Sequence, residues 1–178
     1  MDRFFYNEIA QSTAYRKSRE YIRDWVIASP ELFSSLTEIA FNIKDKHHYK
    51  ACWVLELLCE EDIKILYPHL NAFCKTMAHF QINGAIRSPS KICFLISQAK
   101  NLALTAQQEN QLIETCLDWL IQDKKVAIKA YAMRALYNFG KKHPWIHSEL
   151  QHILTKDFNR YSPGYKVAAK EILQKINH

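Results

Sequence analysis

The sequence contains little glycine, with only Gly84, Gly140 and Gly164 among its 178 residues. Sheet proteins built on tight turns need glycine for positive φ angles, so this scarcity argues against a β fold. The sequence also lacks a CxxC pair, a long apolar run and a low-complexity segment. The usual signals of a zinc site, a membrane-spanning helix and an interdomain linker are therefore missing.

The chain contains five cysteines, an odd number, and most of them lie on apolar stripes of helical spacing. This pattern predicts buried free thiols in a reducing compartment. The N-terminal residues have no secretory hydrophobic region. We therefore expect a cytoplasmic protein with no membrane partner.

Hydrophobic residues make up 48% of the sequence and charged residues 24%, and the formal net charge is +6. This balance is typical of a globular protein, and the length suits a single domain over residues 1–178. The positive charge permits an acidic partner. A dedicated nucleic-acid binder usually has a denser basic run than this chain contains.

Five basic residues recur along the chain, each at the start of a segment with helical periodicity: Arg19, Lys50, Arg87, Lys129 and Lys166. We call this set the basic column. The intervals are 31, 37, 42 and 37 residues (50−19, 87−50, 129−87, 166−129). A period of this size indicates stacked helical repeats.

The apolar spacing predicts ten helices in five antiparallel pairs. The pairs are 2–11 with 14–27, 29–43 with 48–59, 62–79 with 87–101, 105–121 with 125–139, and 145–157 with 163–177. Thr105 is a predicted N-cap, and Pro144 and Pro163 lie near predicted helix starts. Gly84 and Gly140 are predicted to end helices. Pro68 should bend the helix that contains it.

The segment Ile128-Lys129-Ala130-Tyr131-Ala132-Met133-Arg134-Ala135-Leu136 resembles the core of the second helix of a HEAT repeat. The segments that begin at Tyr49 and Tyr165 follow the same pattern, so the resemblance covers nearly the whole chain. It implies an all-α fold, a right-handed α-solenoid of about five HEAT-like antiparallel helix pairs. The chain would be a small, bacterial-type single-domain member of this armadillo-type class. Its second helices would line the inner face.

The basic column has two interpretations. In HEAT-type stacks, such a basic residue pairs with a turn aspartate, which would join Lys50 to Asp45 and Lys129 to Asp123. Alternatively, the column forms an inner stripe that binds acidic groups. The predicted binding residues are Arg19, Arg87, Lys129 and Lys166.

Other candidates are better explained by packing. The aromatic residues of the second helices lie at helical spacing, which favours core positions over base stacking. These residues are Trp25, Trp53, Tyr131 and Tyr137. The histidines at 47, 48, 143 and 147 are predicted to lie on the surface, and no metal ligand is predicted.

The sequence thus predicts a noncatalytic scaffold that binds a macromolecular partner through its inner face, with no cofactor. A protein partner is favoured over nucleic acid. The alternative is a nucleic-acid-binding or DNA-repair protein that resembles the HEAT-like DNA glycosylases, which use a catalytic aspartate. Asp24 beside Trp25 is a poor counterpart, because adjacent residues point to different helix faces. No catalytic residue is predicted, and the oligomeric state is left open.

Overall fold

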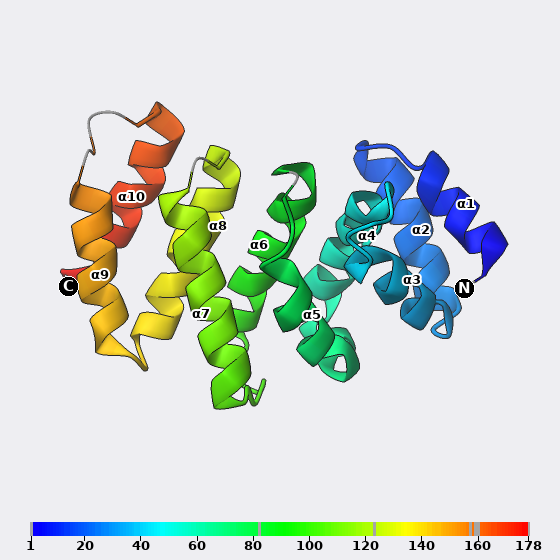
Figure 1. The fold of residues 1–178 in the computed structure, drawn as a ribbon, viewed down its shortest axis with the longest axis horizontal. Coiled ribbons are helices and arrows are strands. Elements are labelled where there is room, and N and C mark those ends of the chain that lie inside the picture. Colours follow the sequence, from blue (N-terminus) through cyan, green and yellow to red (C-terminus); the bar gives the residue numbers. More distant parts are fainter. Residues whose placement is uncertain (1, 82, 123, 157, 159–160, 178) are drawn as a thin grey trace. The chain divides into compact units, whose positions relative to one another are not determined.

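A computed structural model describes residues 2–81, 83–122, 124–156, 158 and 161–177 of the chain. These residues form α-helices and 3-10 helical turns and contain no strand, which confirms the all-α prediction (Figure 1). The elements are α1 (Arg3–Gln11), α2 (Arg16–Ala28), α3 (Leu32–Phe41), α4 (His48–Glu61), η1 (Ile63–His69), α5 (Leu70–Met77), α6 (Asn83–Gln98), α7 (Ala106–Ile121), α8 (Val126–Gly140), α9 (Pro144–Thr155) and α10 (Pro163–Ile176).

The chain forms two compact units, and their boundary falls inside α6. Unit 1 comprises Met1–Ile92 and unit 2 comprises Cys93–His178. Each unit contains alternating first and second helices of the predicted pairs. Because each has its own apolar core, the two units are described separately.

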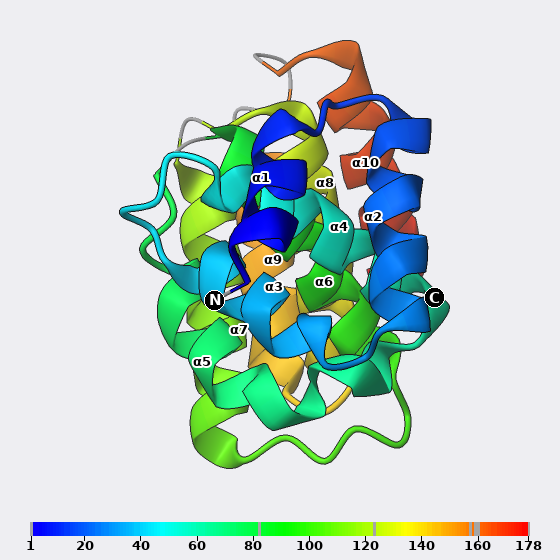
Figure 2. The same ribbon diagram turned by 90° about the vertical axis from the view of Figure 1, so that its right-hand side faces the viewer.

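Helix α4 is the centre of unit 1 and packs against α1, α2, α3 and η1 (Figure 2). Its sequence is apolar around most of its circumference, as expected of a helix with neighbours on several sides. Ala51 and Val54 are fully buried, together with Leu36 of α3. The small side chain of Ala51 lets neighbouring helices approach α4 closely.

The segment predicted as one helix over 62–79 is divided in two. Asp62 caps a 3-10 helix over Ile63–His69, and α5 follows from Leu70. Pro68 lies inside the 3-10 helix and has no N–H to donate. The single helix predicted over 62–79 is therefore replaced by two helical segments, and the bend at Pro68 stays a prediction.

In unit 2, α8 packs against α7, α9 and α10. Figure 1 shows α7 and α9 in front of α8 and α10, which gives the unit two layers of helices. Ala132 of α8 and Ala169 of α10 are fully buried, and their small side chains let neighbouring helices pack closely.

Several predicted helix boundaries are confirmed. Thr105 forms a capping box with Gln108, and Pro144 and Pro163 open α9 and α10. Gly140 is the last residue of α8. The prediction for Gly84 was wrong, because α6 begins at Asn83 and Gly84 lies in its first turn.

All five cysteines are buried, and none of them forms a disulfide within the described part of the chain, as predicted. Burial raises the pKa of Cys74 to about 12 and raises those of Cys52 and Cys59 further. The reactive species is the thiolate, so the native protein should react with a thiol reagent at pH 8 about a hundredfold more slowly than the urea-unfolded chain. Mass spectrometry of the labelled sites checks this, and rapid native labelling of any cysteine would contradict it.

No helix in the described part of the chain has the length and apolar character needed to cross a membrane.

Candidate functional site

The residues of the basic column have different partners. Lys50 Nζ donates hydrogen bonds to the carbonyls of Ala10 at 2.5 Å and Ser12 at 2.8 Å. These carbonyls lie at the C-terminal end of α1, where the last C=O groups of a helix have no N–H donor from a following turn. The predicted Lys50–Asp45 pair was wrong, because Asp45 instead accepts bonds from the Tyr6 hydroxyl and the His47 backbone N–H.

Arg87 pairs with a buried carboxylate on α4. Its Nη1 lies 2.9 and 3.1 Å from the two oxygens of Glu56, whose side chain is only 2% exposed. The Ser88 hydroxyl donates to the same carboxylate at 2.5 Å. Arg87 is a predicted binding residue with no turn aspartate near it in sequence, and the structure shows that its partner is this glutamate of α4.

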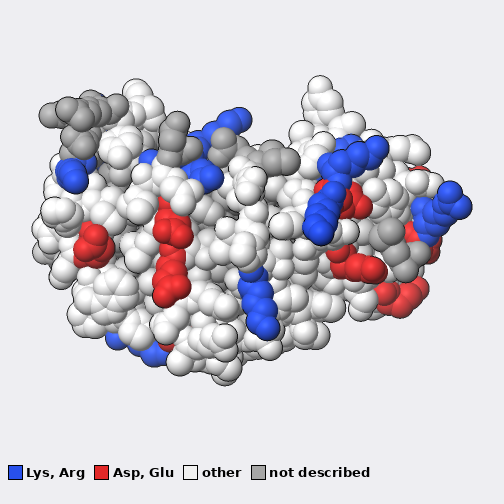
Figure 3. All heavy atoms as spheres, viewed as in Figure 1, with Lys and Arg blue, Asp and Glu red and all other residues white. Residues whose placement is uncertain are grey.

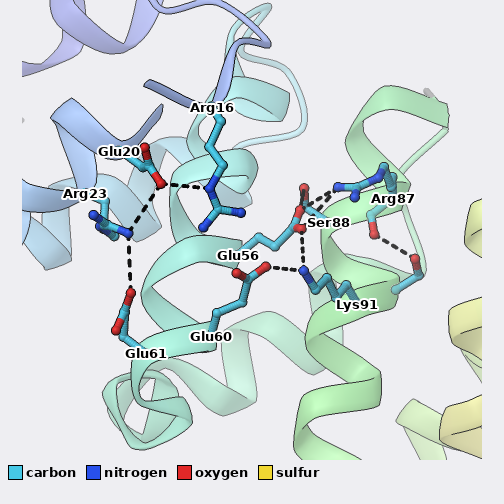
Figure 4. Close-up of polar contacts among 10 residues, drawn as sticks. Arg16, Glu20, Arg23, Glu56, Glu60, Glu61, Arg87, Ser88 and Lys91 are labelled. Atoms are coloured by element: carbon cyan, nitrogen blue, oxygen red, sulfur yellow. Dashed lines mark hydrogen bonds and ion pairs between the residues drawn. The ribbon is translucent and has the colours of Figure 1, made fainter. Parts of the chain in front are cut away.

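Lys91, one turn further along α6, completes this group. Its Nζ lies 3.3 Å from Glu56 Oε1 and also pairs with Glu60 (Figure 4). We call Glu56, Glu60, Arg87, Ser88 and Lys91 the Glu56 cluster. Its two cations and two anions balance, and its contacts join α4 to α6. The cluster therefore holds unit 1 together and has no excess charge to offer a ligand.

Lys129 is buried, with 6% of its surface exposed. Its Nζ lies 5.1 Å from the centre of the Tyr161 ring and 5.9 Å from that of Tyr165. This position favours a structural cation–π role over contact with a partner. The predicted partner Asp123 lies outside the described residues.

Arg19 and Lys166 are both half-buried. Arg19 Nε is shielded from solvent and has no hydrogen-bond partner among the described residues. Lys166 Nζ lies 6.0 Å from the centre of the Phe158 ring, at the edge of cation–π range. These two residues remain predicted binding residues.

The histidines differ in exposure. His48 is only 3% exposed, so its predicted surface position was wrong. It is the first residue of α4 and packs against the Phe80 ring, with 5.3 Å between ring centroids. Burial lowers the pKa of His48 and favours the neutral ring. In the part of the chain that the structure describes, no group of three or more His, Cys, Asp or Glu residues is placed to bind a metal ion.

A hollow of about 370 Å³ opens on the second helices of unit 2. Ligand pockets are commonly of this size. We call it the Tyr137 hollow, and its lining residues are Phe94, Gln98, Arg134, Tyr137, Asn138, Lys141, Glu171, Ile172 and Lys175. The hollow is open to solvent, and its lining contains more cations than anions. The Glu56 cluster, by contrast, has equal numbers of both.

Glu171 is held between two cations in this hollow. Arg134 Nη2 lies 2.8 Å from its Oε2, and Lys175 Nζ lies 2.7 Å from its Oε1. The hydrogen bonds from Arg134 and Lys175 lower the pKa of Glu171 to about 2. Glu171 is therefore an anion near neutral pH, and it fixes the positions of both cations.

Tyr137 is packed on more than one side. Lys141 Nζ lies 5.1 Å and Lys175 Nζ 5.9 Å from the centre of its ring. The His147 ring stacks on it, with 5.2 Å between the centroids, and His147 Nε2 lies 2.8 Å from the Tyr137 carbonyl oxygen. The phenol ring is thus held in place beside two ammonium groups.

Sequence reasoning had considered Tyr137 but missed the cations around it. Arg134, Tyr137 and Lys141 are at positions i, i+3 and i+7 of α8, which places them on one helix face. Glu171 and Lys175 are four residues apart on α10. The spacing could have predicted a shared face on each of the two helices. That the faces of α8 and α10 border the same hollow is seen only in the three-dimensional structure.

Replacing Glu171 with glutamine should destabilise the fold at pH 7. The pKa of this carboxyl is lowered from 4.5 to about 2 on folding, so its ionised form stabilises the protein. That contribution is present above pH 4.5 and is lost as the pH falls toward 2. The side chain is partly exposed, so we expect about 1 kcal/mol. Urea unfolding at several pH values checks this, and a difference from wild type that persists at the lowest pH would contradict it.

The charges on the surface are mixed in sign. On the face drawn in Figure 3, the Lys and Arg side chains of unit 1 are interspersed with Asp and Glu side chains. Within unit 1, Arg23 contacts both Asp24 and Glu61. The described residues on that face of unit 1 form no continuous basic track of the kind that follows a phosphate backbone.

Comparison with known protein families gives a match over most of the chain. The sequence pattern of the HEAT repeat domain matches residues 6–176. No match was found among curated proteins or among solved structures.

Proposed function

The chain belongs to the HEAT repeat domain family, and we propose that it is a noncatalytic, cytoplasmic scaffold that binds a partner protein through its second helices. Proteins of this kind stack helix pairs and use the resulting extended surface for binding. The single observation that supports the proposal most strongly is the Tyr137 hollow. It lies on second helices and brings an aromatic ring and three cations to one opening.

The residues of the basic column contribute unequally to this proposal. Lys50, Arg87 and Lys129 have partners within the fold, so their main role is structural. Arg19 and Lys166 are proposed as additional contacts. This division favours the structural interpretation of the column for three of its five members.

Nucleic-acid binding is the alternative function. The residues that suggested a DNA glycosylase do not support it well, since Asp24 is exposed and paired with Arg23. A catalytic aspartate would need a position in a cleft beside its substrate. The alternative therefore rests only on the net positive charge of the chain.

Site-specific photo-cross-linking in cells tests the proposal. A photoreactive amino acid would replace Gln98 or Gln174, which are exposed on second helices, or the matched controls Glu38 and Glu114, which are exposed on first helices. We expect protease-sensitive adducts at Gln98 and Gln174 and none at the controls. Nuclease-sensitive adducts would favour the alternative, and equal adducts at all four positions would contradict a second-helix binding face.

A further inference from the structure

The Tyr137 hollow has a net positive charge. Its lining includes the cations Arg134, Lys141 and Lys175 and the single anion Glu171, which leaves an excess of two positive charges. Glu171 interacts with Arg134 and Lys175. Lys141 is exposed, and the contact that its ammonium group makes is with the Tyr137 ring. Its three N–H donors are therefore available to an anionic ligand.

Arg134 also retains hydrogen-bonding capacity. Its guanidinium group has five N–H donors in a planar fork, and the contact with Glu171 Oε2 is made through Nη2. A ligand carboxylate can accept from the remaining donors without breaking the Glu171 pair. The hollow can thus hold two acidic groups, one near Lys141 and one near Arg134.

The hollow also has an apolar part. Phe94, which is partly exposed, supplies apolar surface, and Ile172 lies fully buried behind it. The Tyr137 ring supplies a flat aromatic surface that is fixed by its stacking on His147. A bound segment could therefore place an aliphatic or aromatic side chain among these groups while its acidic side chains meet the cations.

We propose that the Tyr137 hollow binds an extended acidic segment of a partner protein, one that carries Asp or Glu residues on both sides of an apolar residue. This inference rests on the proposed scaffold function and specifies the chemistry of its partner. Charge complementarity selects the occupant, because the excess of two cations matches a short run of carboxylates.

A nucleic acid fits the hollow less well. A phosphate backbone carries a charge at every nucleotide and is bound by a long track of cations. This hollow supplies three cations, and its ionised Glu171 would repel a neighbouring phosphate. A peptide can place a neutral residue opposite Glu171, which a nucleic acid strand cannot do.

The test uses fluorescence anisotropy with the full chain and three labelled probes. The first is a peptide of about a dozen residues with glutamates on both sides of a central leucine. The second has glutamine in place of every glutamate, and the third is a DNA duplex. We expect the acidic peptide to bind, its affinity to fall as salt rises, and the glutamine peptide to bind at least about tenfold more weakly.

Two matched lysine variants locate the site. Lys141→Gln removes a cation of the hollow that makes no ion pair with any described residue, so the fold should be unaffected. Lys170→Gln removes an exposed lysine of α10 that does not line the hollow. We expect Lys141→Gln to weaken binding of the acidic peptide by about three- to tenfold and Lys170→Gln by less than about twofold.

The outcomes separate this inference from the proposed function. If the acidic peptide fails to bind, or if both variants bind it equally well, the inference is overturned. Protein adducts at Gln98 or Gln174 would then still support the scaffold function. A different outcome is that the duplex binds more tightly than the acidic peptide, with Lys141→Gln weakening the binding of the duplex. That result would mean that the hollow binds nucleic acid, and it would also overturn the inference.

Discussion

Replacing Arg87 with alanine is expected to lower the free energy of unfolding by about 2 kcal/mol. Removing one partner of a fully buried ion pair costs about 3–5 kcal/mol, because the other charge is left uncompensated. Glu56 is 2% exposed, but the Arg87 side chain is 42% exposed, so solvent reduces the effect. Urea unfolding followed by circular dichroism measures the change.

A double-mutant cycle distinguishes this pair from general disruption of α6. In a chain that already contains Glu56→Gln, the Arg87 substitution should cost less than about 1 kcal/mol, because no buried anion is left without its partner. Lys166→Ala is the matched control from the basic column and should cost less than about 0.5 kcal/mol. Additive costs of the Glu56 and Arg87 substitutions would show that the pair does not stabilise unit 1.

Replacing Gly140 with alanine is expected to destabilise unit 2 by about 1–3 kcal/mol. A Cβ atom built at this position would lie 2.0 Å from Cδ2 and 2.3 Å from Nε2 of the His147 ring. The ring would have to move, and it would lose its stacking on Tyr137 and its contact with the Tyr137 carbonyl. Gly140 thus lets α9 approach the end of α8, and the conformation of Tyr137 depends on it.

Removing the His147 ring should relieve this clash. In a His147→Ala background, Gly140→Ala is expected to cost nothing or to stabilise slightly, since alanine favours helices more than glycine does. Gly164→Ala is the matched control, because its Cβ would meet only a Val126 methyl at 3.4 Å. An equal loss of thermal stability with and without His147 would exclude the clash as the cause.

Much of the fold was predictable because its signals are local. Thr105, Pro144 and Pro163 mark helix starts through hydrogen bonds or fixed φ angles within a few residues. The repeat spacing indicated stacked helix pairs, and the buried alanines Ala132 and Ala169 fit the predicted packing. These features depend little on which distant residues meet.

The candidate site was less predictable because its contacts are long-range. Glu56 and Arg87 are 31 residues apart, and no turn signal connects them. Lys50 was matched to the nearest aspartate in sequence, whereas its ammonium group reaches carbonyls about forty residues earlier. Which acceptor a basic side chain finds depends on how the helices stack, and sequence spacing alone does not specify that.

The most direct test of a binding face on the second helices is a map of amide chemical-shift changes when the acidic peptide is added to the full chain. The largest changes are expected in α8 and α10, near Tyr137 and Glu171. Residues of α7 and α9 should change little. Changes confined to α7 and α9, or spread evenly over the helices of unit 2, would contradict the account.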